Sequence, residues 1–107
     1  MIINVNQVLK RINGETMKDI VEQTDDNGNI IKVAVDATIK MALVNAVLSP
    51  VQKESGIDKV KKYELAKKIY SSDEVDLNED DIKLIKECVG EVFSAEVVGQ
   101  LYELLKV

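Results

Sequence analysis

The sequence predicts an α+β fold, with a small N-terminal antiparallel β-hairpin element followed by about four α-helices. Asn-Gly pairs separate short β-branched runs in residues 1–35, whereas residues 36–107 carry apolar side chains at helical spacing behind capping residues. A chain of 107 residues can bury one hydrophobic core and is too short for two. We therefore expect one compact domain over residues 1–107, with a β-hairpin region at 1–35 and a helical region at 36–107.

Two turn signals define the hairpin region. The first apolar segment, INVNQVL, alternates like an imperfect strand, and a helical turn starting at Asn6 is the competing interpretation. Asn13-Gly14 and Asn27-Gly28 are pairs preferred in tight turns whose central residues take positive φ. The second pair separates residues 20–24 from the β-branched run at 30–35. Two such turns predict a small antiparallel sheet.

The first two helices are marked by caps and a proline. Asp36 is the expected N-cap of a helix that is apolar on nearly every side and therefore central. Ser49-Pro50 ends this helix, because the proline ring disfavours helical geometry in the preceding residue. Ser55 and Asp58 resemble a capping box, which opens a second helix through about Tyr70.

The last two helices follow the acidic segment SSDEVDL, which we expect to be a connection without regular structure. Asn78 is the expected N-cap of the third helix, and Gly90 is its expected C-terminal stop. Ser94 opens the fourth helix. No internal repeat or low-complexity tract interrupts this order.

Composition restricts the classes of partner and compartment. The formal net charge is −5, from 14 Lys and Arg against 19 Asp and Glu, which disfavours nucleic acid as a partner. The single cysteine, Cys88, allows no intrachain disulfide, which fits a reducing compartment. The sequence contains no signal peptide or membrane span, so we expect a cytoplasmic protein without a membrane partner.

The stretch TDDNGNI, residues 24–30, looks at first like part of a calcium-binding loop. With Gly28 at the glycine position of an EF-hand, the first and twelfth ligand positions fall on Gln23 and Ala34. Both anchoring carboxylates are therefore missing, and the following residues are β-prone rather than helical. We expect a turn and no metal site here.

The run from Lys59 to Lys68 is basic, and Tyr63 and Tyr70 flank its second half, a pattern that could contact nucleic acid. The lysines spread around the helix and acidic residues interrupt them, so a solvated helix face is the favoured interpretation. We expect both tyrosines to be core residues with hydroxyls at its boundary.

A second charged cluster is acidic and surrounds the start of the third helix. Carboxylates at a helix N-terminus are expected for capping alone. They could also mimic the phosphates of a nucleic acid, which makes the cluster a candidate acidic patch. Its members are Asp73, Glu74, Asp76, Glu79, Asp80 and Asp81.

The sequence lacks the residue types and motifs that enzymes commonly use for catalysis. The sequence has no histidine, the usual general base near neutral pH. Cys88 therefore has no partner for a Cys-His pair and is expected to be a buried small apolar residue. No glycine-rich phosphate loop, HExxH or GxSxG motif occurs. We expect no catalytic, cofactor-binding or metal-binding residue, and no enzymatic activity.

The C-terminal helix supplies a candidate interaction surface. Its apolar residues occupy two adjacent rows, more than a surface helix needs. Those rows could bind a protein partner or a second copy of the chain. The candidate residues are Val97, Val98, Leu101, Tyr102 and Leu105.

Several segments in order carry a resemblance over most of the chain: NGETMKD, DDNGN, KKYELAKKIY, DEVDLNEDDIKLIKECVG and VVGQLYELL. The chain resembles small uncharacterised proteins encoded by tailed bacteriophages and prophages. Where those proteins carry Pro before the last helix, this chain has Ser94-Ala95. The resemblance implies an origin in a phage or prophage, hence the cytoplasm of a bacterial host cell, and supplies no catalytic residues.

These observations lead to one expected function and one main alternative. The expected function is a non-enzymatic interaction protein that binds a phage or host protein or associates with itself. The alternative is an acidic inhibitor that occupies a nucleic-acid-binding site on a host or viral enzyme. A nucleic-acid binder using residues 59–68 and a carboxylate-only enzyme have less support.

Overall fold

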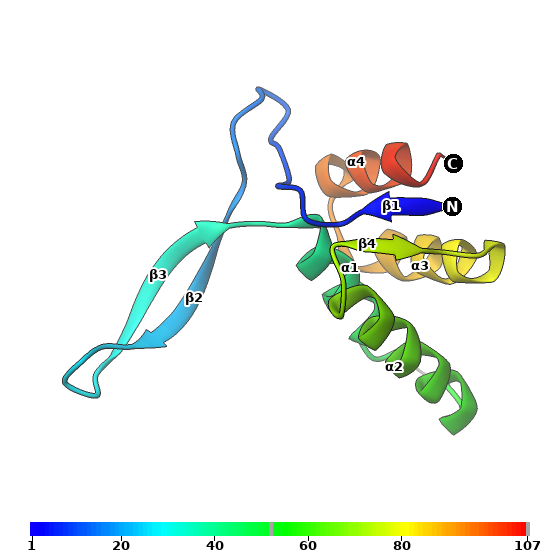
Figure 1. The fold of residues 1–107 in the computed structure, drawn as a ribbon, viewed down its shortest axis with the longest axis horizontal. Helices are drawn as coiled ribbons and strands as arrows, with labels where there is room; N and C mark the ends of the chain where they lie inside the picture. Colours follow the sequence, from blue (N-terminus) through cyan, green and yellow to red (C-terminus); the bar gives the residue numbers. More distant parts are fainter. Residues whose placement is uncertain (52, 107) are drawn as a thin grey trace.

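The structure is a computed structural model that describes residues 1–51 and 53–106, and it has the predicted α+β class. This part of the chain contains four helices and two small antiparallel sheets (Figure 1). The elements are β1 (Ile2–Asn4), β2 (Lys18–Thr24), β3 (Ile30–Asp36), α1 (Ile39–Leu48), α2 (Gly56–Tyr70), β4 (Glu74–Asp76), α3 (Glu79–Val92) and α4 (Ala95–Leu105).

The predicted hairpin is the β2–β3 pair, which runs from the Lys18–Asp36 pair to the Thr24–Ile30 pair. The N-terminal segment is a strand rather than a helical turn, but it is short, and its partner is β4. This second sheet was not expected, because β4 lies in the acidic segment assigned to a connection. Val75 and Leu77 alternate there and are both buried, so the strand depends on its contact with the core.

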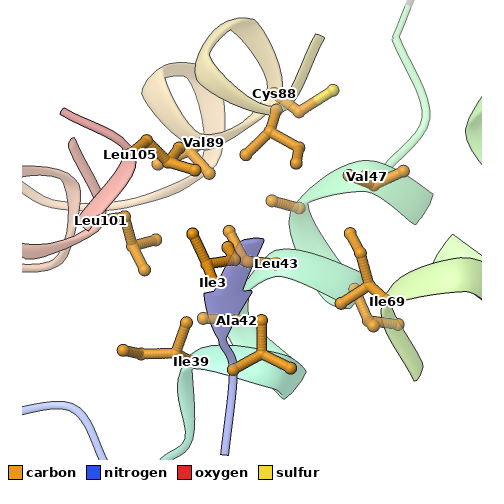
Figure 2. Packing of buried hydrophobic residues seen from close by; sticks show 14 of the residues in the cluster. Ile3, Ile39, Ala42, Leu43, Val47, Ile69, Cys88, Val89, Leu101 and Leu105 are labelled. Atoms are coloured by element: carbon orange, nitrogen blue, oxygen red, sulfur yellow. The ribbon is translucent and has the colours of Figure 1, made fainter. Parts of the chain in front are cut away.

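The apolar helix α1 lies at the centre of the molecule, as predicted (Figure 2). Its N-cap is Thr38, whose hydroxyl accepts a hydrogen bond from the Met41 amide at 3.3 Å. The prediction of Asp36 as the cap is wrong, because Asp36 ends β3 and forms an ion pair with Lys18. The predicted stop at Ser49 is confirmed, since Ser49 is the C-cap residue.

The caps of α2 and α3 are confirmed. Ser55 accepts from the Asp58 amide at 3.1 Å, and Asn78 forms a reciprocal capping box with Asp81. The prediction that α3 ends at Gly90 is wrong, because the helix continues to Val92. A Cβ atom at Gly90 would lie 3.2 Å from the Tyr102 hydroxyl oxygen, so this glycine permits a close approach of α4.

One cluster of buried apolar side chains forms the core. It receives residues from β1, β4, all four helices and the segments around Leu9 and Ala37, and none from β2 or β3. Its members are Ile3, Val5, Leu9, Ala37, Ile39, Ala42, Leu43, Val44, Ala46, Val47, Leu65, Ala66, Ile69, Val75, Leu77, Ile85, Cys88, Val89, Val97, Leu101 and Leu105.

Within residues 1–51 and 53–106, no helix combines the length and the hydrophobicity needed to cross a bilayer.

Candidate functional site

The β2–β3 hairpin and its tip, residues 18–36, project from the helical body as an arm (Figure 1). No residue of the arm is buried. In the part of the chain that the structure describes, β2 and β3 have only each other as sheet neighbours. The outer edge of each strand therefore presents backbone groups that no third strand pairs with.

Local backbone geometry explains why the tip of the arm forms. The Asp25 carboxylate accepts hydrogen bonds from the amides of Asn27 and Asn29 at 2.9 and 2.8 Å. The Asp25 amide donates to the Asn29 carbonyl at 2.9 Å, and Gly28 takes a φ of +84°. This conformation suits glycine and the Asx-type turn of an aspartate. The prediction of a hairpin tip at TDDNGNI is confirmed.

The register of the strands gives the arm one strongly apolar face. Val21 lies directly opposite Val33, and Ile31 and Val35 lie on the same face two residues to either side of Val33. We call these four residues the valine face. Its members are partly or well exposed in the single chain.

The other face of the arm is more polar. The ion pair of Lys18 with Asp36 and the opposed Glu22 and Lys32 lie on it. Ile20 also lies there, with 66% of its surface exposed. Apolar side chains are thus exposed on both faces of the arm, and the valine face carries the continuous set.

Three backbone hydrogen bonds attach the arm to the body. The Leu9 amide donates to the Ala37 carbonyl at 2.8 Å, the Met17 amide to the Leu9 carbonyl at 2.9 Å, and the Ala37 amide to the Met17 carbonyl at 2.9 Å. Leu9 and Ala37 are buried in the core. The base of the arm is therefore held by the packed part of the protein.

The preceding turn rests on α4 and supports the same base. A turn forms at the predicted position, but only Gly14 takes a positive φ, +91°, whereas Asn13 does not take the expected positive value. The turn is closed by the Gly14 amide, which donates to the Arg11 carbonyl at 2.8 Å. The Lys10 amide donates to the Gln100 side-chain oxygen at 2.7 Å, and the Ile12 amide donates to the Glu96 carboxylate at 2.8 Å.

A second exposed apolar surface lies on α2. Ile57, Val60, Tyr63 and Tyr70 are 71%, 58%, 55% and 62% exposed, and we call them the outer face of α2. The prediction that both tyrosines are core residues is wrong. The opposite side of the helix, with Leu65, is the one that enters the core.

The predicted lysine-rich face is mostly exposed, with one exception. Lys62 is only 9% exposed and forms an ion pair with Glu54, close to Cys88. Burial lowers the pKa of Lys62, but the bond to Glu54 and nearby negative charge outweigh it, so the pKa is raised. The bond to Lys62 in turn lowers the pKa of Glu54. Lys62 is thus committed to an internal ion pair.

Cys88 is buried, as predicted. Burial raises the pKa of its thiol, although the nearby Lys62 charge opposes the shift. The neutral thiol is therefore favoured over the nucleophilic thiolate. Across residues 1–51 and 53–106, no three His, Cys, Asp or Glu side chains gather as they would around a metal ion.

The candidate interaction row on α4 is largely inside the molecule. Val97, Leu101 and Leu105 are buried, and Val98 and Tyr102 pack against the core. The Tyr102 hydroxyl donates to the Lys86 carbonyl at 2.9 Å. Self-association through this row stays a prediction, and little surface of the row is available for it.

The candidate acidic patch is partly used within the chain. Asp73 pairs with Lys40 at 3.1 Å, Asp76 with the N-terminal amine at 3.4 Å, and Asp81 with Lys68 at 3.1 Å. Asp81 also completes the capping box of α3. The other members are Glu74, Glu79 and Asp80, which are exposed. Half of the carboxylates thus form ion pairs within the chain, and the inhibitor hypothesis stays a prediction.

In comparisons with known proteins, no family model, curated protein or solved structure matches this chain.

Proposed function

We propose that the chain is a non-enzymatic protein that acts by binding another protein through the arm. The observation that carries the proposal is the projection of residues 18–36 without a buried side chain. A two-stranded hairpin is marginally stable on its own in water, and this one receives no shielding for its apolar residues from the described body. A partner that covers the arm would remove this unfavourable exposure.

The exposed apolar side chains of the arm favour an apolar protein surface as the partner. Fully burying a Val or Ile side chain contributes roughly 1.5–3 kcal/mol. The valine face alone offers Val21, Ile31, Val33 and Val35. Exposed strand edges of this kind otherwise lead to aggregation, which soluble proteins avoid by pairing or covering them. The resemblance to phage and prophage proteins suggests a phage protein, a host protein or another copy as the partner.

Site-specific photo-crosslinking tests this proposal. Cys88 is buried and is the only cysteine, so a cysteine introduced on the arm can carry a maleimide photo-crosslinker selectively. We expect Ile30→Cys, at the exposed distal end of β3, to give protein adducts in extracts of cells that encode the chain. Mass spectrometry then identifies the adducts, including adducts with the chain itself.

The matched control is Ile12→Cys, which labels an isoleucine outside the arm that is 94% exposed, against 71% for Ile30. Adducts specific to the arm position support the proposal. Equal or absent adducts at both positions, with labelling efficiency confirmed by mass, contradict it.

A further inference from the structure

Two apolar surfaces of this chain have no covering element among its described residues. One is the valine face of the arm, and the other is the outer face of α2. Both surfaces face solvent. The helix α2 packs mainly against α1 rather than against β2 or β3. In Figure 1 the arm and α2 extend from the body in different directions, so one chain does not bring them together.

The two elements match in length. Each strand of the arm has 7 residues, which span about 23 Å at the rise of a β-strand. The helix α2 has 15 residues, which span about 22 Å at the rise of an α-helix. The arm can therefore lie along the helix, with the valine face, which spans about 13 Å over residues 31–35, against part of the outer face.

The two surfaces also carry opposite charge. The arm holds two lysines against five carboxylates, a net charge of −3. The helix α2 holds five lysines against two carboxylates, but Lys62 pairs with Glu54 and Lys68 with Asp81. The remaining three lysines and two carboxylates give the helix a net charge of +1. Lys67 lies on the outer side beside Tyr63, with its amine 5.3 Å from the ring centre. Opposite charges of this kind favour encounter and fix orientation.

We infer that the valine face of one copy binds the outer face of α2 of a second copy, in a head-to-tail arrangement. This inference rests on the proposed function and names its partner. A head-to-tail contact differs from a symmetric dimer because each copy uses two different surfaces. Each copy can therefore bind two neighbours.

Two charge-adding variants test the contact. Val33→Lys places a positive charge on the arm against the basic helix, and Val60→Glu places a negative charge on the helix against the acidic arm. We expect wild-type protein to associate in sedimentation-velocity experiments as its concentration rises. Each variant should weaken this association by at least about tenfold, because each places a charge in the apolar centre of the contact.

Matched controls test whether a loss of association comes from the added charge alone or from a folding defect. Ile12→Lys and Val92→Glu make the same chemical changes at exposed apolar residues outside both surfaces, and we expect association unchanged. All four substituted positions lie outside the core cluster, so circular dichroism should show wild-type helicity.

A mixing experiment distinguishes head-to-tail binding from every symmetric alternative. The Val33→Lys chain retains its helix surface, and the Val60→Glu chain retains its arm. We expect an equimolar mixture to associate through the intact arm of one variant and the intact helix of the other, although each variant alone stays monomeric. A mixture that remains monomeric overturns the inference, as does wild-type protein that never associates.

The result of the association experiments can be distinguished from the result of the cross-linking experiment that tests the proposed function. If the arm cross-links to a different protein while the purified chain is monomeric, the partner inferred here is wrong and the binding role of the arm stands. If the arm cross-links to no protein at all, both fail.

Discussion

Gly90 and Tyr102 show how one missing side chain allows two helices to approach. A Cβ atom at position 90 would lie 3.2 Å from the Tyr102 hydroxyl oxygen, which is committed to the Lys86 carbonyl. That hydroxyl must shift by a few tenths of an ångström to accept a larger residue. Gly99, in α4, has open space around the same position and provides the comparison.

Alanine substitutions at the two glycines should therefore differ. Gly99→Ala should raise the free energy of unfolding by about 0.8–1 kcal/mol, the difference in helix propensity. Gly90→Ala should raise it by less, because its methyl group displaces the Tyr102 hydroxyl. In a Tyr102→Phe background, Gly90→Ala should recover the larger gain. Urea unfolding of the variants measures these values.

Tyr102→Phe alone should cost about 1 kcal/mol through the lost hydrogen bond. Equal effects of the two glycine substitutions in the wild-type background would refute the proposed crowding at Gly90.

Glu54 and Lys62 link the segment before α2 to the body, and their ion pair should make stability depend on pH. The pKa of Glu54 is lowered from 4.5, so its contribution is complete above pH 4.5 and is lost as pH falls through the lowered value. The pKa of Lys62 is raised from 10.5, so its contribution is complete below pH 10.5. Between these values the pair is intact.

Glu54→Gln should lower the melting temperature at pH 7, because it leaves the poorly exposed Lys62 without its carboxylate. The difference from wild type should shrink as pH falls below 4.5, where wild-type Glu54 also becomes neutral. Thermal unfolding from pH 3 to 8 measures it. Glu91→Gln, at an exposed carboxylate that lines one surface pocket together with Glu54 and Lys62, should have little effect at any pH. A pH-independent deficit in Glu54→Gln would exclude the ion pair as its cause.

At the scale of elements, features set by neighbouring residues could be predicted from the sequence more reliably than features set by tertiary contacts. Ser55 and Asn78 were predicted as caps because a cap involves only the next three residues. Asp36 was predicted as a cap because aspartate is a capping residue type, and only the pairing of β3 with β2 shows that Asp36 is used elsewhere. The strand around Val75 could not be predicted, since its partner, β1, lies some 70 residues earlier.

In the candidate site, too, the local features could be predicted from the sequence and the tertiary ones could not. The hairpin turn at Gly28 was predicted from local chemistry, but the projection of the arm was not. One signal was available: Ile20 and Val21 are adjacent in β2 and so lie on opposite faces, which leaves no purely polar face for solvent. The exposure of Tyr63 and Tyr70 was not predictable from spacing, because it depends on which side of α2 meets α1.

The arm and the core should be energetically independent elements. Replacing residues 18–36 by Asn-Gly would connect Met17 directly to Ala37 through a tight turn, since these residues already share a hydrogen bond. We expect the free energy of unfolding to change by no more than about 1 kcal/mol, because the arm contributes nothing to the core. Urea unfolding followed by circular dichroism provides the measurement.

Leu43→Ala is the contrasting variant, because Leu43 is fully buried in α1. It should cost about 2–5 kcal/mol. If removing the arm cost as much as this substitution, or abolished cooperative unfolding, the arm would be part of the folding unit.

For the whole molecule, the separation of charge matters more than its total. The net charge of −5 conceals an acidic arm and a basic α2 on one chain. Head-to-tail contacts between such surfaces close into a ring if the rotation between neighbours permits it, and extend into a filament if it does not. A ring would use every arm and every α2, which would explain how a small contact area could hold an assembly together.

The hydrogen bond between Ala37 and Met17 also has a consequence for divergence. Because it closes the root of the arm, inserting or deleting two residues in each of β2 and β3 would change the reach of the arm and keep the other side chains on their faces of the hairpin. Two residues added to each strand extend the arm by about 6.6 Å and leave the buried side chains in place. Related proteins could therefore exchange one binding specificity for another by altering this hairpin while inheriting the helical body unchanged.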